Sequence, residues 1–402
     1  MEKKLSVNDL DVKGKRVLLR VDFNVPLSKE GTITDFKKIE ESLPTIQLLL
    51  DRGAKIILLS HLGKPEGKKV DSLSLKILIE PLSRALGKQI QFLGDCVGEE
   101  VKTGINNLAG RDIALLENLR FHPEEENPSL NPKFTQSLAS LGDLYVDDAF
   151  GSMHRAHASI VSICKYFPKT SAMGLLVEKE LRYLLGALEN PSLPFFAIVG
   201  GAKISSKLSL LSKLQEKVNA LFIGGAMAFT FLKSQRFGIG SSFCEGDLLD
   251  EAKKILEKAK NRRCEIHLPL DLMIAKNPHS ASIKKHVTIQ EGVPDGWYGV
   301  DIGPLTIAHW QTLLKEGSTI FWNGPLGVFE IPPFAEGTFQ IAKTLANLKS
   351  ATTIIGGGDS AAAIAQLGIE DKFTYISTGG GASLELIEKQ ALPGVEALTT
   401  IK

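Results

Sequence analysis

The chain has 402 residues, of which 43% are hydrophobic and 23% are charged, and its net charge is +1. This length favours two domains, and the apolar content is sufficient for two cores. The near-neutral charge argues against a general nucleic-acid or membrane-surface binder, so any basic site must be local.

The cysteines and the first residues indicate an intracellular protein. Cys96, Cys164, Cys244 and Cys264 are scattered without a CxxC pair, which predicts neither a disulfide framework nor a zinc site. The N-terminus has no apolar signal region, and no uncharged apolar run reaches membrane-span length. We therefore expect a cytoplasmic protein without a membrane partner.

The first half alternates β-rich runs with amphipathic helical stretches, which is typical of a parallel sheet with crossover helices. A helix over 40–52, closed by Gly53, falls between the first two strands. Ligands of such sheets bind beyond the carboxyl ends of the strands. The strands that we expect are 16–21, 55–59, 112–116 and 143–146.

Positive side chains gather just after these strand ends. Each alone could be a solvated surface charge, but four strands deliver cations to one edge of one sheet. Clustered Arg and Lys suit a small polyanion that carries phosphate or carboxylate. The candidates are Arg20, Lys38, His61, Lys64, Arg120, His122, His154, Arg155 and His157, with Asp22 and Asn24 as acceptors for substrate hydroxyls. His154 and His157 have the spacing of a metal pair, but no third ligand of suitable type is placed nearby, so anion contact is favoured.

The second half begins with a predicted helical linker over 174–186 and continues with strands that mostly end in glycine. This pattern predicts a second doubly wound domain with a nucleotide-sized site at its strand ends. The strands that we expect are 195–199, 221–223, 265–267, 319–321, 352–355 and 373–376.

The turn at 356–358 consists of three glycines between a buried strand and an alanine-rich helix. A helix N-terminus behind such a turn offers N–H groups and a positive dipole end to an anion. A tight structural turn is only slightly less favoured by this stretch alone. Asp359 would repel a phosphate here unless Mg²⁺ is bound, and a simple N-cap role for Asp359 is an equal alternative.

Neither the dinucleotide fingerprint after a first strand nor the Walker sequence is present. Lys203 and Lys207 stand four residues apart instead, and they share one face if Ser205 begins a helix. A helix dipole disfavours cations at this end, so two lysines there favour an anionic ligand over a solvated first turn.

Ten long motifs follow one another in the chain. They are RVDFNVP (20–26), SHLGKP (60–65), ENLRFH (117–122), DAFGSMHRAHAS (148–159), GGAK (200–203), GGAMAFTFL (224–232), DIGP (301–304), WNGPLGVFE (322–330), GGGDSAAA (356–363) and STGGGASLE (377–385). In content and order they resemble the phosphoglycerate kinase family from end to end, and a chance match is not credible.

The resemblance implies reversible phosphoryl transfer from 1,3-bisphosphoglycerate to ADP, which gives 3-phosphoglycerate and ATP, with Mg²⁺. It also implies an α/β fold with two doubly wound, Rossmann-like domains that face each other across a hinged cleft. The phosphoglycerate domain would span 1–172 with 390–402 crossing back, the linking helix 173–188, and the nucleotide domain 189–389. A monomer is the family expectation.

The resemblance also assigns residues. Those matching the phosphoglycerate site are Asp22, Asn24, Lys38, His61, Lys64, Arg120 and Arg155. Those matching the nucleotide site are Lys207, Asn323, Glu330, Gly357, Gly358, Asp359 and Ser360, with Glu330 on the ribose hydroxyls and Asp359 on the metal. The catalytic group would be Lys38, Lys203, Gly357 and Gly358. No general base is needed, because the acceptor carboxylate is ionised at pH 7.

The chain departs from the family at four positions. Lys38 and Lys64 replace arginines, Asp147 replaces an asparagine, and Ser206 replaces an aspartate. Lysine keeps the charge but loses the bidentate fork, and Asp147 adds negative charge near an anion site. A kinase for another anionic acceptor and a non-catalytic nucleotide-binding protein are the alternatives. The retained Lys203, Lys207, Glu330 and Asp359 argue against the second.

Overall fold

The computed structural model describes residues 2–262 and 264–401. The chain divides into two compact units, Met1–Arg182 with Lys389–Lys402 and Tyr183–Glu388, which we call unit 1 and unit 2. The first border falls inside helix α6 (Leu175–Glu189). None of the helices in the described ranges is long and apolar enough to cross a membrane.

Unit 1 is built on six parallel strands in the order β3-β4-β2-β1-β5-β6. Each of the four strands expected in this half is present, with ends that agree within one residue. The two others, β3 and β6, have three residues each, which is too short for a clear pattern. The strands are β1 (Arg16–Arg20), β2 (Lys55–Leu59), β3 (Gln91–Leu93), β4 (Ile113–Leu116), β5 (Leu144–Asp147) and β6 (Ser171–Met173).

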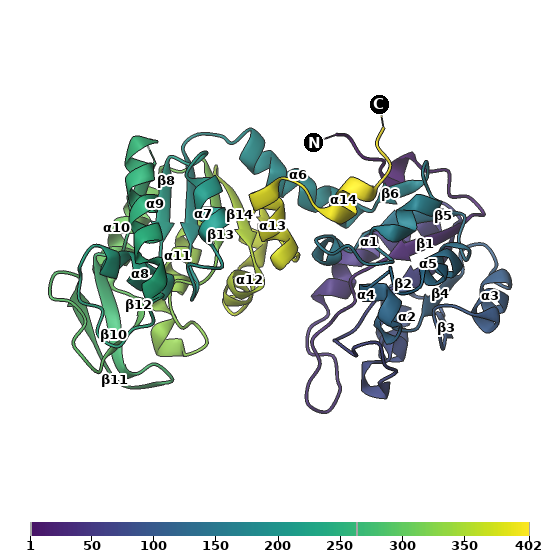
Figure 1. The fold of residues 1–402 in the computed structure, drawn as a ribbon, viewed down its shortest axis with the longest axis horizontal. Helices are drawn as coiled ribbons and strands as arrows, with labels where there is room; N and C mark the ends of the chain where they lie inside the picture. Colours follow the sequence, from purple (N-terminus) through teal and green to yellow (C-terminus); the bar gives the residue numbers. More distant parts are fainter. Residues whose placement is uncertain (1, 263, 402) are drawn as a thin grey trace. The chain divides into compact units, whose positions relative to one another are not determined.

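Helix α1 (Lys37–Asp51) shows how the helices of unit 1 pack. Ile39, Ile46, Leu49 and Leu50 are buried on one face of it, at the spacing of an amphipathic helix. The C-terminal segment also belongs to unit 1, where the N–H of Leu5 donates to the carbonyl oxygen of Thr399 at 2.8 Å (Figure 1). The other helices of this unit are α2 (Ile79–Leu86), α3 (Glu99–Asn106), α4 (Pro123–Glu126), α5 (Pro132–Ala139) and α14 (Pro393–Ala397).

Unit 2 has its own six-stranded parallel sheet, in the order β15-β14-β13-β7-β8-β9. All six strands expected here are present. The chain runs from β7 outward to β9 and from β13 outward to β15, so the direction reverses between β7 and β13. Ligand sites of open α/β sheets lie at this switch point. The strands are β7 (Phe195–Val199), β8 (Ala220–Ile223), β9 (Glu265–His267), β13 (Thr319–Asn323), β14 (Thr352–Gly356) and β15 (Tyr375–Ile376).

The central strands of this sheet are buried on both faces. Trp322 of β13 and Phe222 of β8 share one core with Trp310 of α10. The helices of unit 2 are α7 (Leu208–Leu214), α8 (Met227–Ser234), α9 (Leu249–Asn261), α10 (Pro304–Leu314), α11 (Glu336–Ala346), α12 (Gly358–Ala365) and α13 (Gly381–Lys389). The two doubly wound parallel sheets confirm the predicted α/β fold class.

A third, antiparallel sheet in unit 2 is absent from the sequence prediction. It consists of β10 (Asp271–Asn277), β11 (Ser280–Thr288) and β12 (Tyr298–Ile302), in the order β11-β10-β12. Figure 1 shows it at the lower left, below the helices of unit 2. Leu272 and Ile274 of β10 pack with Phe229 of α8 in a small core of their own.

Candidate active site

The loops after β1, β2 and β4 of unit 1 are joined through Gly63. Asn24 Oδ1 accepts the N–H of Gly63 at 2.8 Å, and Arg120 Nη1 donates to the Gly63 carbonyl oxygen at 2.9 Å. Asn24 in turn donates its own N–H to Asp22 Oδ1 at 3.1 Å. The structure therefore brings the predicted residues Asp22, Asn24 and Arg120 together at the carboxyl edge of the sheet.

Lys38 and His61 lie beside Asp22 in the same cluster. Lys38 Nζ is 2.8 Å from Asp22 Oδ2. Burial of Asp22 favours its neutral form, but nearby positive charge, above all that of Lys38, outweighs burial and lowers the pKa of Asp22 to about 2. His61 Nδ1 is 3.1 Å from Arg20 Nη2. A guanidinium only donates, so Nδ1 is the acceptor and the neutral ring carries its proton on Nε2.

Positive charge is in excess in this cluster. Burial lowers the pKa of His61 well below 6.5, and the charge of Arg20 lowers it further. Burial also lowers the pKa of Arg120. Glu126, whose carboxylate lies 3.2 Å from Arg120 Nε, raises it, and the charges of Arg20 and Arg155 lower it. Cations that depress one another's pKa values are stabilised by an anion, so the cluster suits an anionic ligand.

Lys64 and Arg155 are placed differently from the buried members of the cluster. Lys64 follows Gly63 on the loop after β2, and Arg155 lies beyond β5; both side chains are exposed. Arg155 still acts on Arg120 through its charge. His157 is buried, with Nδ1 3.9 Å from Glu125 Oε1.

Glu125 supports the cluster and was not among the residues predicted from the sequence. It is fully buried and accepts both the N–H of Ser159 at 3.0 Å and the Ser159 hydroxyl at 2.6 Å. Ser159 Oγ accepts in turn from Arg20 Nε at 2.9 Å. Glu125 thus fixes the position of Arg20 against His61. No signal in the sequence separates Glu125 from the glutamates on either side of it, because burial alone distinguishes them.

Asp147, which was expected to add negative charge near an anion site, lies inside unit 1, where the charge of Arg20 acts on its carboxyl group. It is fully buried; Oδ1 accepts the N–H of Ala149 at 3.0 Å, and Oδ2 lies 3.0 Å from the Tyr145 hydroxyl. That hydroxyl has one proton and already lies 2.5 Å from the carbonyl oxygen of Ser159. Burial raises the pKa of Asp147 from 3.8 to about 6. An ionised Asp147 therefore competes with Ser159 for one proton.

We predict that Asp147→Asn stabilises the protein at pH 8. An amide can donate to the Tyr145 hydroxyl while that hydroxyl donates to Ser159, and it keeps the bond from Ala149. Because the carboxyl pKa is higher in the folded than in the unfolded chain, the folded wild type loses stability as pH rises from about 4 to about 6. The gain should be on the order of 1–3 kcal/mol above this window and vanish below it. Urea unfolding at pH 4 and pH 8 measures it.

Asp143→Asn serves as the control, because Asp143 pairs with Arg16 at 2.7 Å in an exposed position next to β5. Its ion pair contributes about 0–1 kcal/mol, so the change should be small and of opposite sign. A gain for Asp147→Asn that is equal at pH 4 and pH 8 would contradict the titration argument.

In unit 2, the loops after β7 and β13 meet at the switch point. The N–H of Gly200 donates to the carbonyl oxygen of Asn323 at 2.8 Å. A Cβ on Gly200 would lie 2.1 Å from the carbonyl oxygen of Pro325. Only glycine allows the two loops to approach this closely.

Asn323 joins three of the predicted nucleotide-site segments. Its Oδ1 accepts from Lys207 Nζ, and its Nδ2 donates to the carbonyl oxygen of Gly356 at 2.6 Å. The N–H of Gly324 donates to Ser360 Oγ at 2.6 Å. Asn323, Lys207 and Ser360 therefore converge on the glycine turn after β14.

The predicted helix start at Ser205 is wrong, because α7 begins at Leu208. Ser205 donates both its N–H at 3.0 Å and its hydroxyl at 2.6 Å to Glu245, and these bonds accompany a turn over 204–207. Lys203 and Lys207 thus do not share a helix face. Lys207 points to Asn323, whereas Lys203 is exposed.

Helix α12 begins at Gly358, with Gly357 as N-cap at φ +97°. Asp359 is therefore not the N-cap; it lies in the first turn, where a carboxylate is favoured by the helix dipole. Burial lowers the pKa of Lys207, and Asp359 acts in the opposite direction. The first-turn N–H groups of a helix have no partner within the helix, so this end suits an anion.

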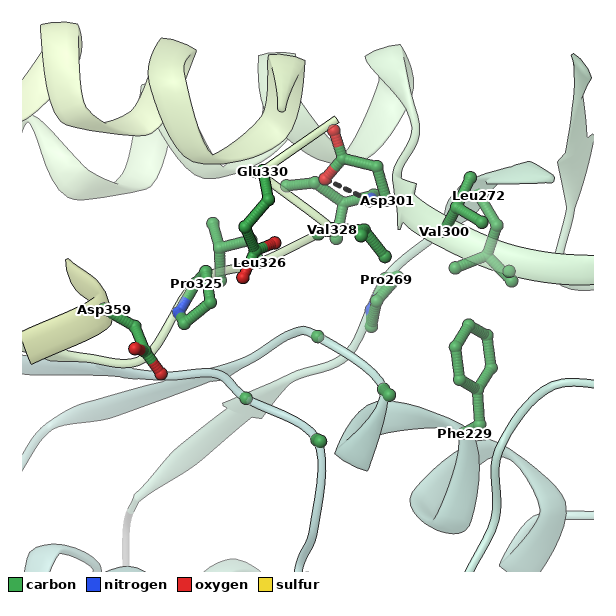
Figure 2. A pocket seen from close by; sticks show the side chains of 17 residues that line it. Phe229, Pro269, Leu272, Val300, Asp301, Pro325, Leu326, Val328, Glu330 and Asp359 are labelled. Carbon is green, nitrogen blue, oxygen red and sulfur yellow. Dashed lines mark hydrogen bonds between the residues drawn. The ribbon is translucent and has the colours of Figure 1, made fainter. Parts of the chain in front are cut away.

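A pocket of about 230 Å³ opens beside these residues. Figure 2 shows Asp359 and Phe229 at opposite ends of it, with Glu330 near Asp359. Leu272 and Val300 line the end near Phe229. This apolar end could not be predicted from the sequence, because the third sheet that supplies part of it was not predicted.

Asp301 forms part of the pocket wall and ties β12 to the start of α11. Its carboxylate accepts the N–H of Gly337 at 2.7 Å and that of Ile302 at 2.8 Å. Burial raises the pKa of Asp301 to about 8. The DIGP motif therefore has a structural role at the pocket.

Unit 1 gathers cations at its strand ends, and unit 2 has a glycine turn and an apolar pocket at its switch point. This arrangement suits the class of the small-molecule phosphotransferases. Residues 7–390 match the family described as Phosphoglycerate kinase. The chain therefore belongs to the phosphoglycerate kinase family, glycolytic kinases that transfer a phosphoryl group to or from a carboxylate.

Individual relatives agree with the family match. Phosphoglycerate kinase of Dictyoglomus turgidum is 50% identical over 394 residues, which cover 98% of each chain. That of Gloeothece citriformis is 50% identical over 390 residues, 96% of each chain. The solved structure of the enzyme from Coxiella burnetii has a TM-score of 0.88 at 38% identity, with 98% of each chain covered. The enzyme from Pyrococcus horikoshii has a TM-score of 0.84 at 30% identity, also with 98% of each chain covered.

Proposed function

We propose that unit 2 binds ATP or ADP and that unit 1 binds 3-phosphoglycerate or 1,3-bisphosphoglycerate. The observation that carries the proposal is the junction at Asn323, which holds Lys207 beside a glycine turn and a helix N-terminus. Backbone N–H groups and an ammonium are the groups that hold phosphates. The apolar end of the pocket suits a base, and Glu330 can accept from ribose hydroxyls.

Mg²⁺ fits the acidic side of the pocket. Asp359 presents an exposed carboxylate there, next to the glycine turn. Mg²⁺ in nucleotide sites takes one or two carboxylates, with waters and phosphate oxygens as its other ligands, so one carboxylate is enough. Asp359 would hold the ion, which when bound neutralises charge on the phosphate oxygens.

In unit 1, the excess positive charge around Arg120 suits the phosphate of the substrate, and Asp22 and Asn24 suit its hydroxyl. The acceptor carboxylate is ionised at pH 7, so the protein's task is alignment and charge neutralisation. Lys38, Lys203 and the N–H groups of Gly357 and Gly358 are the groups that we assign to the transferring phosphoryl group.

The domain limits that we propose are 1–172 with 390–402 for phosphoglycerate, 173–188 for the linking helix and 189–389 for the nucleotide. Because the two substrates are assigned to different domains, transfer requires a closure that aligns them and excludes water. We expect small-angle scattering to give a smaller radius of gyration with both substrates than with either alone. An unchanged radius would contradict closure.

A coupled assay with ATP, Mg²⁺ and 3-phosphoglycerate tests the function. We expect turnover with this acceptor and none with acceptors that lack a carboxylate beside a phosphorylated carbon chain. Turnover only with another acceptor would favour a different kinase. Folded protein without turnover would contradict the proposal that the chain is an enzyme.

Asp359→Asn tests the metal assignment in the same assay. We expect a loss of about 10- to 100-fold in kcat/KM for ATP and a higher Mg²⁺ requirement, because the amide binds the ion poorly. Asp371→Asn is the control, since Asp371 is exposed and pairs with Lys372 at 2.8 Å. Equal effects of the two variants would show that Asp359 is not a ligand of the metal.

We further propose a cytoplasmic monomer without nucleic-acid or membrane partners. The net charge of +1 supports the absence of nucleic-acid and membrane partners, because general binders of polyanions are basic. Light scattering on purified protein should give the mass of one chain, and a dimer mass would contradict the monomer.

A further inference from the structure

We propose that Asp95, Cys96 and His122 of unit 1 form a zinc-binding site. They offer a carboxylate oxygen, a sulfur and an imidazole nitrogen, and these ligand atoms all lie within 4.8 Å of one another. Over residues 2–262 and 264–401, no other group of three or more His, Cys, Asp or Glu side chains converges in this way. The proposed phosphotransfer site uses none of the three.

Two neighbouring strands of the sheet deliver these ligands. Asp95 and Cys96 follow β3, and His122 follows β4, its neighbour in the sheet. The N–H of Glu117, at the end of β4, lies 3.4 Å from the carbonyl oxygen of Asp95, so the two loops also meet through the backbone. The parallel sheet therefore positions the ligands, and they do not depend on one mobile loop.

The imidazole is already oriented toward the carboxylate. The His122 ring stacks on Phe134, with ring centroids 5.1 Å apart, and its Nε2 lies 2.7 Å from Asp95 Oδ1. The same Asp95 oxygen accepts the N–H of Cys96 at 2.6 Å. These contacts keep the three side chains close together before the metal arrives. The proton that Nε2 donates to Asp95 must leave before Nε2 can bind the metal.

The ligand set selects the metal. Sulfur and imidazole nitrogen favour zinc, whereas Mg²⁺ and Ca²⁺ require oxygen ligands. Zinc bonds of roughly 2.0–2.3 Å place ligand atoms about 3.3–3.8 Å apart. Asp95 and His122 must then separate slightly from their 2.7 Å contact. This is feasible because the Asp95 side chain is 52% exposed, which also leaves room for water as a fourth ligand.

Zinc must displace the thiol proton of Cys96. The thiol is buried and not in a disulfide. Burial raises its pKa well above 9.0, with Asp95 and Glu125 acting in the same direction. Zinc binds cysteine as the thiolate, so the thiol proton leaves when the metal binds. The positive charge of the metal also offsets the charge of Asp95, which otherwise disfavours the thiolate. The sulfur is therefore the ligand whose participation a spectrum can report.

Cobalt(II) substitution of the chelator-treated full chain tests the site without nucleotide. We expect one Co²⁺ per chain, a near-ultraviolet thiolate-to-cobalt band, and displacement of the Co²⁺ by one equivalent of Zn²⁺. Cys96→Ser should abolish the band. Asp95→Asn and His122→Gln should each weaken Zn²⁺ binding about 10-fold or more. Cys244→Ser is the matched control, because Cys244 is a half-buried thiol of unit 2, and it should leave both readouts unchanged.

The proposal is overturned if wild-type protein shows no thiolate band, or if Cys96→Ser keeps it. It is equally overturned if Asp95→Asn and His122→Gln bind Zn²⁺ as tightly as Cys244→Ser does. These two positions are partly exposed, so their variants decide the question even if Cys96→Ser does not fold.

Discussion

Lys38→Met should lower kcat/KM for 3-phosphoglycerate by about 100- to 1000-fold, which corresponds to about 3–4 kcal/mol. Lys38 lies in the first turn of α1, where the helix dipole disfavours a cation, and its Nζ contacts the buried carboxylate of Asp22 at 2.8 Å. We assign its charge to the transferring group, so its loss removes stabilisation where negative charge develops. Steady-state kinetics in the coupled assay measures the effect.

Two further variants separate charge from shape at this position. Lys38→Arg keeps the charge and adds the bidentate fork, so we expect kcat/KM within about 10-fold of the wild type. Lys37→Met is the control on the neighbouring residue and should change kcat/KM by less than about 2-fold. If Lys38→Met and Lys37→Met have equal activity, Lys38 has no catalytic role.

Asp22 provides an independent readout of the same contact. Its pKa of about 2 depends on Lys38, so in Lys38→Met it should rise. An unpaired buried carboxylate also costs stability, on the order of 3 kcal/mol. Thermal unfolding should therefore show a lower Tm at pH 7 for Lys38→Met than for Lys38→Arg. Equal Tm values would contradict the ion pair.

Gly357→Ala should reduce kcat by about 100-fold or more. Gly357 has φ +97°, and an added Cβ would lie 2.7 Å from Asn323 Nδ2. The backbone strain costs on the order of 1–3 kcal/mol. The methyl group must also displace Asn323, which holds Lys207 and the Gly356 carbonyl oxygen, so the proposed phosphate contacts are lost together. kcat, KM for ATP and Tm are measured on one preparation.

Gly368→Ala isolates the strain from the loss of the site. Gly368 also has positive φ, +62°, but an added Cβ would meet nothing within 4 Å. We expect a stability loss of about 1 kcal/mol with unchanged kcat. If Gly357→Ala also kept its kcat, the glycine turn would not take part in phosphate binding.

The parallel strands could be predicted because their signals are local. The run from Thr319 to Phe321 was predicted as a strand before a glycine turn, and β13 covers this run and continues to Asn323. Helix α1 was predicted to begin at Glu40 and begins at Lys37. Pro44 lies inside this helix. The apolar periodicity of the helix was easier to recognise in the sequence than the residues at which it begins.

Other features depend on contacts between distant residues. Ser205 could begin a helix by its type, but Glu245, 40 residues further on, binds it in a turn. The strands β10 to β12 bury two small cores, one with Phe229 of α8 and one with Phe334, and no strand was predicted there. Asp147 was expected to add negative charge near an anion site, and only the packing of β5 shows that it is buried.

The sequence by itself determined the family, the fold class and most candidate site residues, because long motifs and glycine-ended strands are contiguous in the chain. Only the tertiary structure decided how those residues are held: Asn323 between Lys207 and the turn at Gly356, and Glu125 behind Arg20. It also supplied the apolar end of the pocket and the convergence of Cys96 with His122. These contacts join segments far apart in the sequence, and folding alone brings them within bonding distance.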